Sequence, residues 1–145
     1  MSDRELDNRT GTMITVDVTV NKPVDYVWQC FTQPEHVVKW NFASDDWHCP
    51  FAENNLTPGG IFRYTMAAKD GTVRFDFEGV FDQIEVNKHL SYILGDKRVV
   101  SIDFIEMNGT TQVVESFEAE GANSVEMQRS GWQAILDNFK KHVEA

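Results

Sequence analysis

The chain has 145 residues, of which 41% are hydrophobic, 12% aromatic and 25% charged. A chain of this length can bury roughly 68% of its unfolded surface in one core, so we expect a single domain over 13–145, preceded by a flexible tail over 1–12. The formal net charge of −10 repels phosphate backbones and anionic lipid surfaces, which argues against nucleic acid and membrane partners.

The N-terminal residues are polar and contain no apolar stretch typical of a signal peptide. No later segment has the length and apolar character of a membrane span. We therefore expect a cytoplasmic protein. Its two cysteines, Cys30 and Cys49, have neither CxxC nor metal-ligand spacing, so both are expected to be reduced, mostly buried thiols.

The first predicted elements are a strand and a helix. Apolar residues alternate over Met13–Val20 with the period of a β-strand. A helix is expected over 23–31, with Asn21 as its cap and Pro23 in its first turn.

A second short helix should follow directly. Thr32 and Glu35 have the spacing of a capping box around Pro34, which predicts a helix ending near Trp40. The region after it is less regular, with a strand expected over 46–51.

The middle of the chain has the pattern of antiparallel β-structure, with hairpin signals at Asp70-Gly71 and Asn108-Gly109. A further turn is expected at Gly95-Asp96, where the pattern leaves the register open. The predicted strands are Ile61–Ala68, 72–86, His89–Leu94, Val99–Met107 and Thr110–Glu118.

A two-residue turn fixes every cross-strand pair, so each hairpin register can be tested against the hydrophobic pattern. At Asp70-Gly71 one face becomes almost wholly aromatic, while the other carries the pair Arg63–Glu78. The pairs on the aromatic face are Met66–Phe75, Tyr64–Phe77 and Phe62–Gly79, and the glycine marks a possible kink.

The register at Asn108-Gly109 predicts a second apolar face with one charge on it. Its pairs are Phe104–Val113, Ile102–Glu115 and Val100–Phe117. On that face desolvation would raise the pKa of Glu115 and suit it to acid–base chemistry or to anchoring a polar ligand group. The alternative, which Glu usually follows, is that its carboxylate reaches solvent at the edge of the sheet.

The last segment predicts one long amphipathic helix over 124–144, with Asn123 and Glu126 at capping-box spacing. Its length of about 31 Å would cross a sheet of about six strands. The apolar stripe that should face the sheet contains Gln128, Trp132, Ile135, Leu136, Phe139 and Val143.

This order of elements is similar to the helix-grip fold of the START and birch-pollen-allergen superfamily: an α+β fold with a curved antiparallel sheet of six or seven strands, two short helices after strand 1 and one long C-terminal helix. Local motifs resemble the activator of Hsp90 ATPase homolog family. They are Pro23 to Trp28 with Thr32, Pro34, Glu35 and Trp40, then Gly59-Gly60-Ile61-Phe62-Arg63, and finally Gly131-Trp132 with Leu136.

The resemblance implies a cavity that holds an apolar ligand between the sheet and the long helix. The family's eukaryotic cochaperone binds its chaperone through a separate domain with no counterpart in these 145 residues, so a chaperone partner is not the expected one. The residues expected to contact a ligand are Trp40, Trp47, Phe62, Tyr64, Met66, Phe75, Phe77, Ile102, Phe104, Glu115, Trp132 and Leu136. The alternative for this aromatic set is a plain packed core.

Other polar residues give little indication of catalysis or metal binding. His48 lacks a partnering nucleophile or second histidine at a known spacing, and His36, His89 and His142 are scattered without a metal-ligand pattern. Neither a metal nor another cofactor is expected.

The expected function is therefore the binding of a small hydrophobic or amphipathic molecule, without catalysis. One alternative is a cyclase- or hydrolase-like enzyme that uses Glu115, Tyr64 and His48 in the same cavity. The other is a protein-interaction module, which predicts exposed apolar residues on the long helix or between Trp40 and Phe51.

Overall fold

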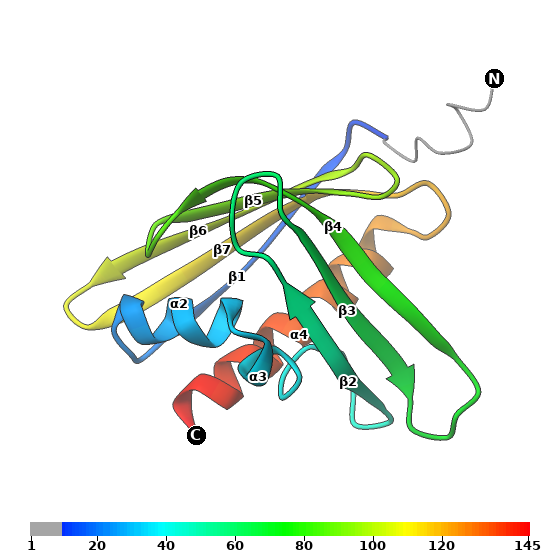
Figure 1. Cartoon of the computed structure of the whole chain (residues 1–145), viewed down its shortest axis with the longest axis horizontal. Helices are drawn as coiled ribbons and strands as arrows, with labels where there is room; N and C mark the ends of the chain where they lie inside the picture. Colours follow the sequence, from blue (N-terminus) through cyan, green and yellow to red (C-terminus); the bar gives the residue numbers. More distant parts are fainter. Residues whose placement is uncertain (1–9) are drawn as a thin grey trace.

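In the computed structural model, residues 10–145 are described and form an α+β fold in which helices lie on one side of a curled antiparallel sheet (Figure 1). The seven strands are ordered β1-β7-β6-β5-β4-β3-β2. They are β1 (Met13–Val20), β2 (Trp47–Asn54), β3 (Ile61–Ala68), β4 (Arg74–Glu85), β5 (His89–Leu94), β6 (Val99–Met107) and β7 (Thr110–Glu118). The predicted fold class is confirmed.

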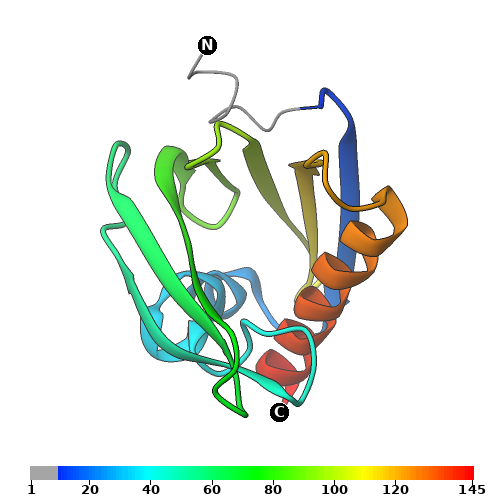
Figure 2. The same ribbon diagram turned by 90° about the vertical axis from the view of Figure 1, so that its right-hand side faces the viewer.

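Three helices complete the described chain: α2 (Val24–Thr32), α3 (Pro34–Val37) and α4 (Val125–Glu144). Figure 2 shows the sheet curling into an open half-barrel, with α4 running along the β1 side. The short helices lie at one end of this half-barrel. Within residues 10–145 no helix is long and apolar enough to cross a membrane.

The tail predicted over 1–12 falls mostly outside the described residues. In the part that is described, Thr10 Oγ1 donates a hydrogen bond of 2.8 Å to the Ala119 carbonyl. The Ala119 amide in turn donates to the Thr12 carbonyl at 2.8 Å. Residues 10–12 therefore run alongside the end of β7.

Both hairpin registers derived from the sequence are confirmed. The β3–β4 pairs include Tyr64–Phe77, although the loop is four residues long, since Ala68 N donates to Val73 O at 2.9 Å. The β6–β7 pairs include Ile102–Glu115. Asn108 and Gly109 both have positive φ, 55° and 80°, as a type I′ turn requires.

The register left open at Gly95-Asp96 is set by a three-residue loop. Leu94 N donates to Arg98 O at 2.9 Å, and Lys97 adopts a φ of 75°. The pairs Leu90–Ile102 and Tyr92–Val100 follow from this loop. Tyr92 and Leu90 are therefore buried on the inner face.

Two predicted helix caps are wrong. Pro23, with φ −70° and ψ 154°, is the N-cap of α2, and Asn21 instead donates its backbone amide to Glu144 Oε2 at 2.8 Å. In α4 the cap is Ser124, whose Oγ accepts from Met127 N at 3.1 Å. Asn123 lies one residue earlier and bonds to Glu120 instead.

The second short helix ends earlier than predicted. Its N-cap is Gln33, and α3 stops at Val37, with turns continuing to Trp40. Thr32 does not cap it, because its Oγ1 donates to the Trp28 carbonyl at 2.8 Å.

The expected kink at Gly79 is not observed, and the Phe62 ring and the Ile93 backbone pack closely against this glycine instead. The irregularity in β4 lies between Phe81 and Gln83. A Cβ on Gly79 would come within 2.7 Å of the Ile93 carbonyl oxygen and 2.9 Å of the Phe62 ring. Glycine at this position lets the Phe62 ring cover the strand.

The inner face is densely packed at the end nearest α2. There Phe31, Trp40 and Phe139 contact one another, with ring centroids 4.9–5.3 Å apart. Phe104 joins Phe31 at 5.5 Å. We call these four rings the packed end of the interior.

Candidate ligand cavity

Beyond the packed end, the inner face of the sheet and the first half of α4 enclose a cavity of about 300 Å³. This volume lies at the lower limit for small-molecule sites and holds on the order of ten water-sized units. The lining residues are Phe31, Trp40, Asn41, Tyr64, Met66, Phe75, Phe77, Tyr92, Arg98, Glu115, Glu120, Asn123, Gln128, Trp132, Ile135 and Leu136.

Most residues expected to contact a ligand do line this cavity. They are Trp40, Tyr64, Met66, Phe75, Phe77, Glu115, Trp132 and Leu136. The edge-to-face pair Phe77–Trp132, with centroids 5.9 Å apart, joins β4 to α4 across it. Trp132 also stacks on Phe117 at 3.8 Å, with the ring planes 9° apart.

Four expected contacts are placed elsewhere. Ile102 and Phe104 are on the predicted face but are buried in the core, where Phe104 packs against Trp28 of α2 at 5.1 Å. Phe62 is buried among its aromatic neighbours, 4.7 Å from Tyr92. Trp47 contacts Phe75 at 6.0 Å and does not line the cavity.

Several lining residues were not predicted. Tyr92 depended on the open register. Asn41, Arg98, Glu120 and Asn123 come from loops or the ends of strands, where sequence periodicity gives no direction. Phe31 and Ile135 belong to recognised apolar stripes and could have been included on that signal.

Glu115 is the central polar group of the cavity. It is 7% exposed because its neighbours across the sheet are Val16 on β1 and Ile102 on β6. The expectation that it reaches solvent at a sheet edge is wrong, since β1 forms that edge. Burial raises the pKa of Glu115 to about 8, so its carboxyl is protonated and uncharged at neutral pH.

The Glu115 carboxyl lacks a protein partner. No hydrogen bond or ion pair within the described part of the chain reaches it. The Tyr92 hydroxyl is also without one, and burial and the nearby Glu115 raise the Tyr92 pKa well above its usual range. Both groups open onto the cavity.

Two further polar residues, Asn41 and Tyr64, line the cavity. Asn41 is 8% exposed, and its Nδ2 has no hydrogen-bond partner among residues 10–145. Asn41 lies near the Cys49 thiol. Burial raises the pKa of this thiol, and the contact with Asn41 lowers it to a smaller extent. A thiol is only a weak acceptor for the Asn41 amide. Tyr64 differs in accepting a hydrogen bond of 3.1 Å from Asn54 Nδ2, and burial raises its pKa to about 12.

Polar residues also line the cavity near the start of α4. Arg98 is fixed there, donating from Nε to Asp96 Oδ2 at 2.8 Å and from Nη1 to the Glu118 carbonyl at 3.2 Å. Gln128 donates to the Glu120 carbonyl at 3.1 Å. The Arg98 bond to Glu118 ties the β5–β6 loop to the end of β7, and the Gln128 bond ties the start of α4 to the residues just after β7.

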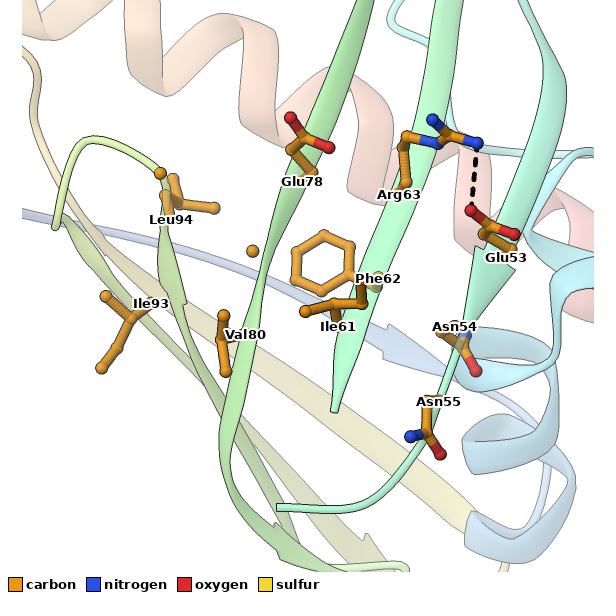
Figure 3. A pocket seen from close by; sticks show the side chains of 12 residues that line it. Glu53, Asn54, Asn55, Ile61, Phe62, Arg63, Glu78, Val80, Ile93 and Leu94 are labelled. Atoms are coloured by element: carbon orange, nitrogen blue, oxygen red, sulfur yellow. Dashed lines mark ion pairs between the residues drawn. The ribbon is translucent and has the colours of Figure 1, made fainter. Parts of the chain in front are cut away.

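A second, larger depression of about 780 Å³ lies on the other side of the sheet (Figure 3). Its side chains Ile61, Val80 and Ile93 alternate with the inward-facing ones, which places them on the outer face. Two of its charged groups form an ion pair, with Arg63 Nη2 3.1 Å from Glu53 Oε1. Unlike the cavity, it combines exposed charges and exposed apolar side chains.

The histidines are less scattered than the sequence indicates. His36 Nδ1 and His142 Nε2 are 2.9 Å apart, although 106 residues separate them. His89 pairs with Asp103 at 2.8 Å. His48 lies on β2 and is not among the residues of the cavity.

A curled seven-stranded sheet gripping one long C-terminal helix, with a cavity between them, defines a helix-grip domain of the START and birch-pollen-allergen class. The sequence profile of the family described as Activator of Hsp90 ATPase homolog 1-like protein matches residues 21–144. The chain belongs to this family, as its motifs predict.

Solved structures agree with this assignment. An AHSA1-like protein from Aeromonas hydrophila is 39% identical over 92% of each chain, with a TM-score of 0.87. A protein from Cytophaga hutchinsonii is 48% identical over 94% of this chain and 92% of its own, with a TM-score of 0.79. A Chromobacterium violaceum protein with 18% identity and a TM-score of 0.82, over 94% and 99%, shares the fold. No curated protein matches the chain.

Proposed function

We propose that the protein binds a small, mainly apolar molecule that carries one hydrogen-bond acceptor, in the cavity between the sheet and α4. The observation that supports this most strongly is Glu115, a buried carboxyl group on the cavity wall without a protein partner. Because this carboxyl group faces the cavity and no side chain hydrogen-bonds to it, a ligand acceptor can take its hydrogen bond without displacing a protein partner.

The polar groups define which ligand would fit. A protonated Glu115 and the Tyr92 hydroxyl can each donate a hydrogen bond, and Asn41 Nδ2 can only donate. Aromatic and aliphatic side chains form much of the remaining wall. A flat apolar body with a carbonyl oxygen is therefore a better match than a cation or a phosphate.

The test uses 2-acetylnaphthalene as the probe and 2-ethylnaphthalene, which lacks the carbonyl, as its matched compound. Binding is measured by NMR, following the indole N–H of Trp132 and the side-chain amide of Gln128. We expect both compounds to bind and the ketone to bind roughly 5- to 10-fold more tightly, the effect of about one hydrogen bond.

Two variants complete this test. Glu115→Gln keeps a donor and should retain the preference for the ketone, while Glu115→Leu should lose it. Binding of neither compound at millimolar concentration, or binding that leaves the Trp132 signal unchanged, would contradict the proposal.

A second candidate is an acid–base enzyme in the same cavity. A carboxyl group with a pKa of about 8 beside a buried tyrosine is poised for proton transfer near neutral pH. If turnover of a cavity-sized carbonyl compound is found, Glu115→Gln should abolish it while binding persists. Undiminished turnover in that variant would exclude Glu115 as the catalytic group.

A third candidate is a protein-interaction module, because the outer face carries an unbroken cross-strand row of exposed apolar residues. Pairing across β3, β4, β5 and β6 joins Ile61, Val80, Ile93 and Val99, which are 39–67% exposed. Around the predicted segment, Trp40 is buried and Phe51 is 39% exposed. A pull-down with Hsp90 that Val80→Lys abolishes would support this role, and no capture by the native protein would exclude that partner.

A further inference from the structure

Three side chains with metal-binding atoms meet where the short helices contact the end of α4. Cys30 comes from the last part of α2, His36 from α3 and His142 from the last turn of α4. Their ligand atoms all lie within 4.8 Å of one another. Sequence spacing could not reveal this cluster, because its third member is 106 residues beyond the second.

The surrounding helices hold these side chains in place. The backbone carbonyl of Cys30 accepts a hydrogen bond of 2.8 Å from Trp40 Nε1. The α2–α3 connection is closed by Gln33 N donating to Gln29 O at 2.9 Å. At the end of α4, Val143 is fully buried, so the adjacent His142 has little freedom to move away.

The distances are close to those of a tetrahedral site. Zinc–nitrogen bonds of 2.0–2.1 Å and zinc–sulfur bonds of about 2.3 Å place neighbouring ligand atoms roughly 3.3–3.6 Å apart. The nitrogens of His36 and His142, at 2.9 Å, would separate by about half an ångström. The Cys30 sulfur, at most 4.8 Å from either nitrogen, would approach by no more than about 1.3 Å. Rotations of side chains cover such movements.

Access and a fourth ligand position are also present. Cys30 is fully buried, while His36 and His142 are partly exposed, so an ion can enter from the surface. Tyr26 interacts with the Cys30 thiol and its ring lies 6.3 Å from that of His36, edge to face. A water molecule or the Tyr26 hydroxyl can occupy the remaining position.

We propose that Cys30, His36 and His142 form a binding site for one zinc-class divalent ion, which links the C-terminal end of α4 to α2 and α3. One thiolate and two imidazoles are typical ligands for a borderline-soft ion such as Zn²⁺, and a poor set for Mg²⁺ or Ca²⁺. The site is separate from the cavity, since none of the three residues lines it.

The test uses the metal alone, with Co²⁺ as a spectroscopic probe and Zn²⁺ as its competitor. We expect one Co²⁺ per chain, with a thiolate-to-cobalt charge-transfer band and the intense visible bands of tetrahedral Co²⁺, both displaced by Zn²⁺. Zn²⁺ at 100 times its Kd should raise Tm by roughly 5–10 °C, because it binds the folded chain.

Matched variants separate this site from other cysteines and histidines. Cys30→Ser should remove the charge-transfer band and His142→Gln should weaken Co²⁺ binding at least 10-fold. Cys49→Ser, at the other buried cysteine, and His89→Gln, at a histidine paired with Asp103, should bind as the native chain does. Circular dichroism confirms that each variant is folded.

Two results would overturn the proposal. The first is a native chain that shows no charge-transfer band with Co²⁺ under reducing conditions. The second is a band that persists in folded Cys30→Ser or disappears in Cys49→Ser.

Discussion

The space between the sheet and α4 is filled by side chains at the packed end and left partly open at the cavity end. At the packed end, α4 contributes Phe139 and Val143, which are fully buried, and rings from α2 and the following turn fill the space between them and the sheet. At the cavity end, α4 contributes Gln128 and the half-buried Trp132, and about 300 Å³ is left open. The same helix and sheet thus enclose a filled core at one end and an open cavity at the other.

The difference lies in what α2 and α3 cover. These short helices bring Trp28, Phe31 and Trp40 over β6, where they bury Phe104. Around Glu115 and Tyr92 these helices contribute Phe31 to the cavity wall but leave about 300 Å³ unfilled. A polar residue can therefore remain on an apolar face, where it meets the cavity instead of another side chain.

The buried carboxyl at the cavity end should make the free energy of unfolding strongly dependent on pH. The Glu115 pKa is about 8 in the folded chain and 4.5 when unperturbed. Below pH 4.5 both states hold the proton. Between these values the unfolded chain loses the proton and the folded chain keeps it, so stability falls as pH rises, by roughly 4–5 kcal/mol in all, and levels off above pH 8.

Denaturant unfolding at a series of pH values checks this, with Glu115→Gln as the control that cannot ionise. The difference in unfolding free energy between the two proteins should change in favour of Glu115→Gln as pH rises from 4.5 to 8. A constant difference would show that the Glu115 carboxyl is solvated.

Large-to-small substitutions should lower the unfolding free energy more at the packed end than at the cavity end. Phe139→Ala removes a fully buried ring from the packed end and should lower the unfolding free energy by about 3–5 kcal/mol. Phe77→Ala, on the wall of the cavity, should cost less than half as much because part of its ring already faces open space. Equal losses in chemical denaturation would contradict the contrast.

Enlarging a side chain should give the opposite contrast. Val143→Phe at the packed end should destabilise the protein by about 1–3 kcal/mol, while Ile135→Phe can extend into the cavity at a cost under about 1 kcal/mol. Thermal unfolding measures both. If Ile135→Phe is as damaging as Val143→Phe, the interior is filled at both ends.

The N-terminal cap of α4 at the cavity end should contribute the least to stability. Ser124→Ala removes the side-chain cap of α4, where Oγ accepts from Met127 N, and should cost about 1 kcal/mol. Asn123→Ala serves as the comparison, because the sequence predicts a cap there and the structure does not. A larger loss for Asn123→Ala would indicate that the helix begins at the predicted cap.

The sequence predicted the strand pairing correctly where the residues of a turn determine the turn type. The turn at Asn108-Gly109 dictates its own register, and this alone placed Glu115 on the inner face. It did not succeed at Gly95-Asp96, because the loop there depends on Lys97 adopting a positive φ, for which a lysine gives no signal. Tyr92 was missed as a result.

The sequence also did not indicate which distant elements of the chain pack against each other. Ile102 and Phe104 lie on the predicted face, but the sequence does not indicate that α2 would cover Phe104. The same limit hid the cluster of Cys30, His36 and His142, whose members come from three helices. Periodicity assigns a side chain to a face, and the packing of distant elements decides whether that face forms a core, a cavity or a site.

The most direct test of this account is a ¹³C NMR titration of the Glu115 carboxyl carbon in the ligand-free protein, assigned by comparison with Glu115→Gln. A midpoint near pH 8, as expected for a carboxyl enclosed in the cavity, would support it. A midpoint near pH 4.5 would show a solvated or paired carboxylate and contradict the placement of Glu115 as a buried, uncharged group of the cavity.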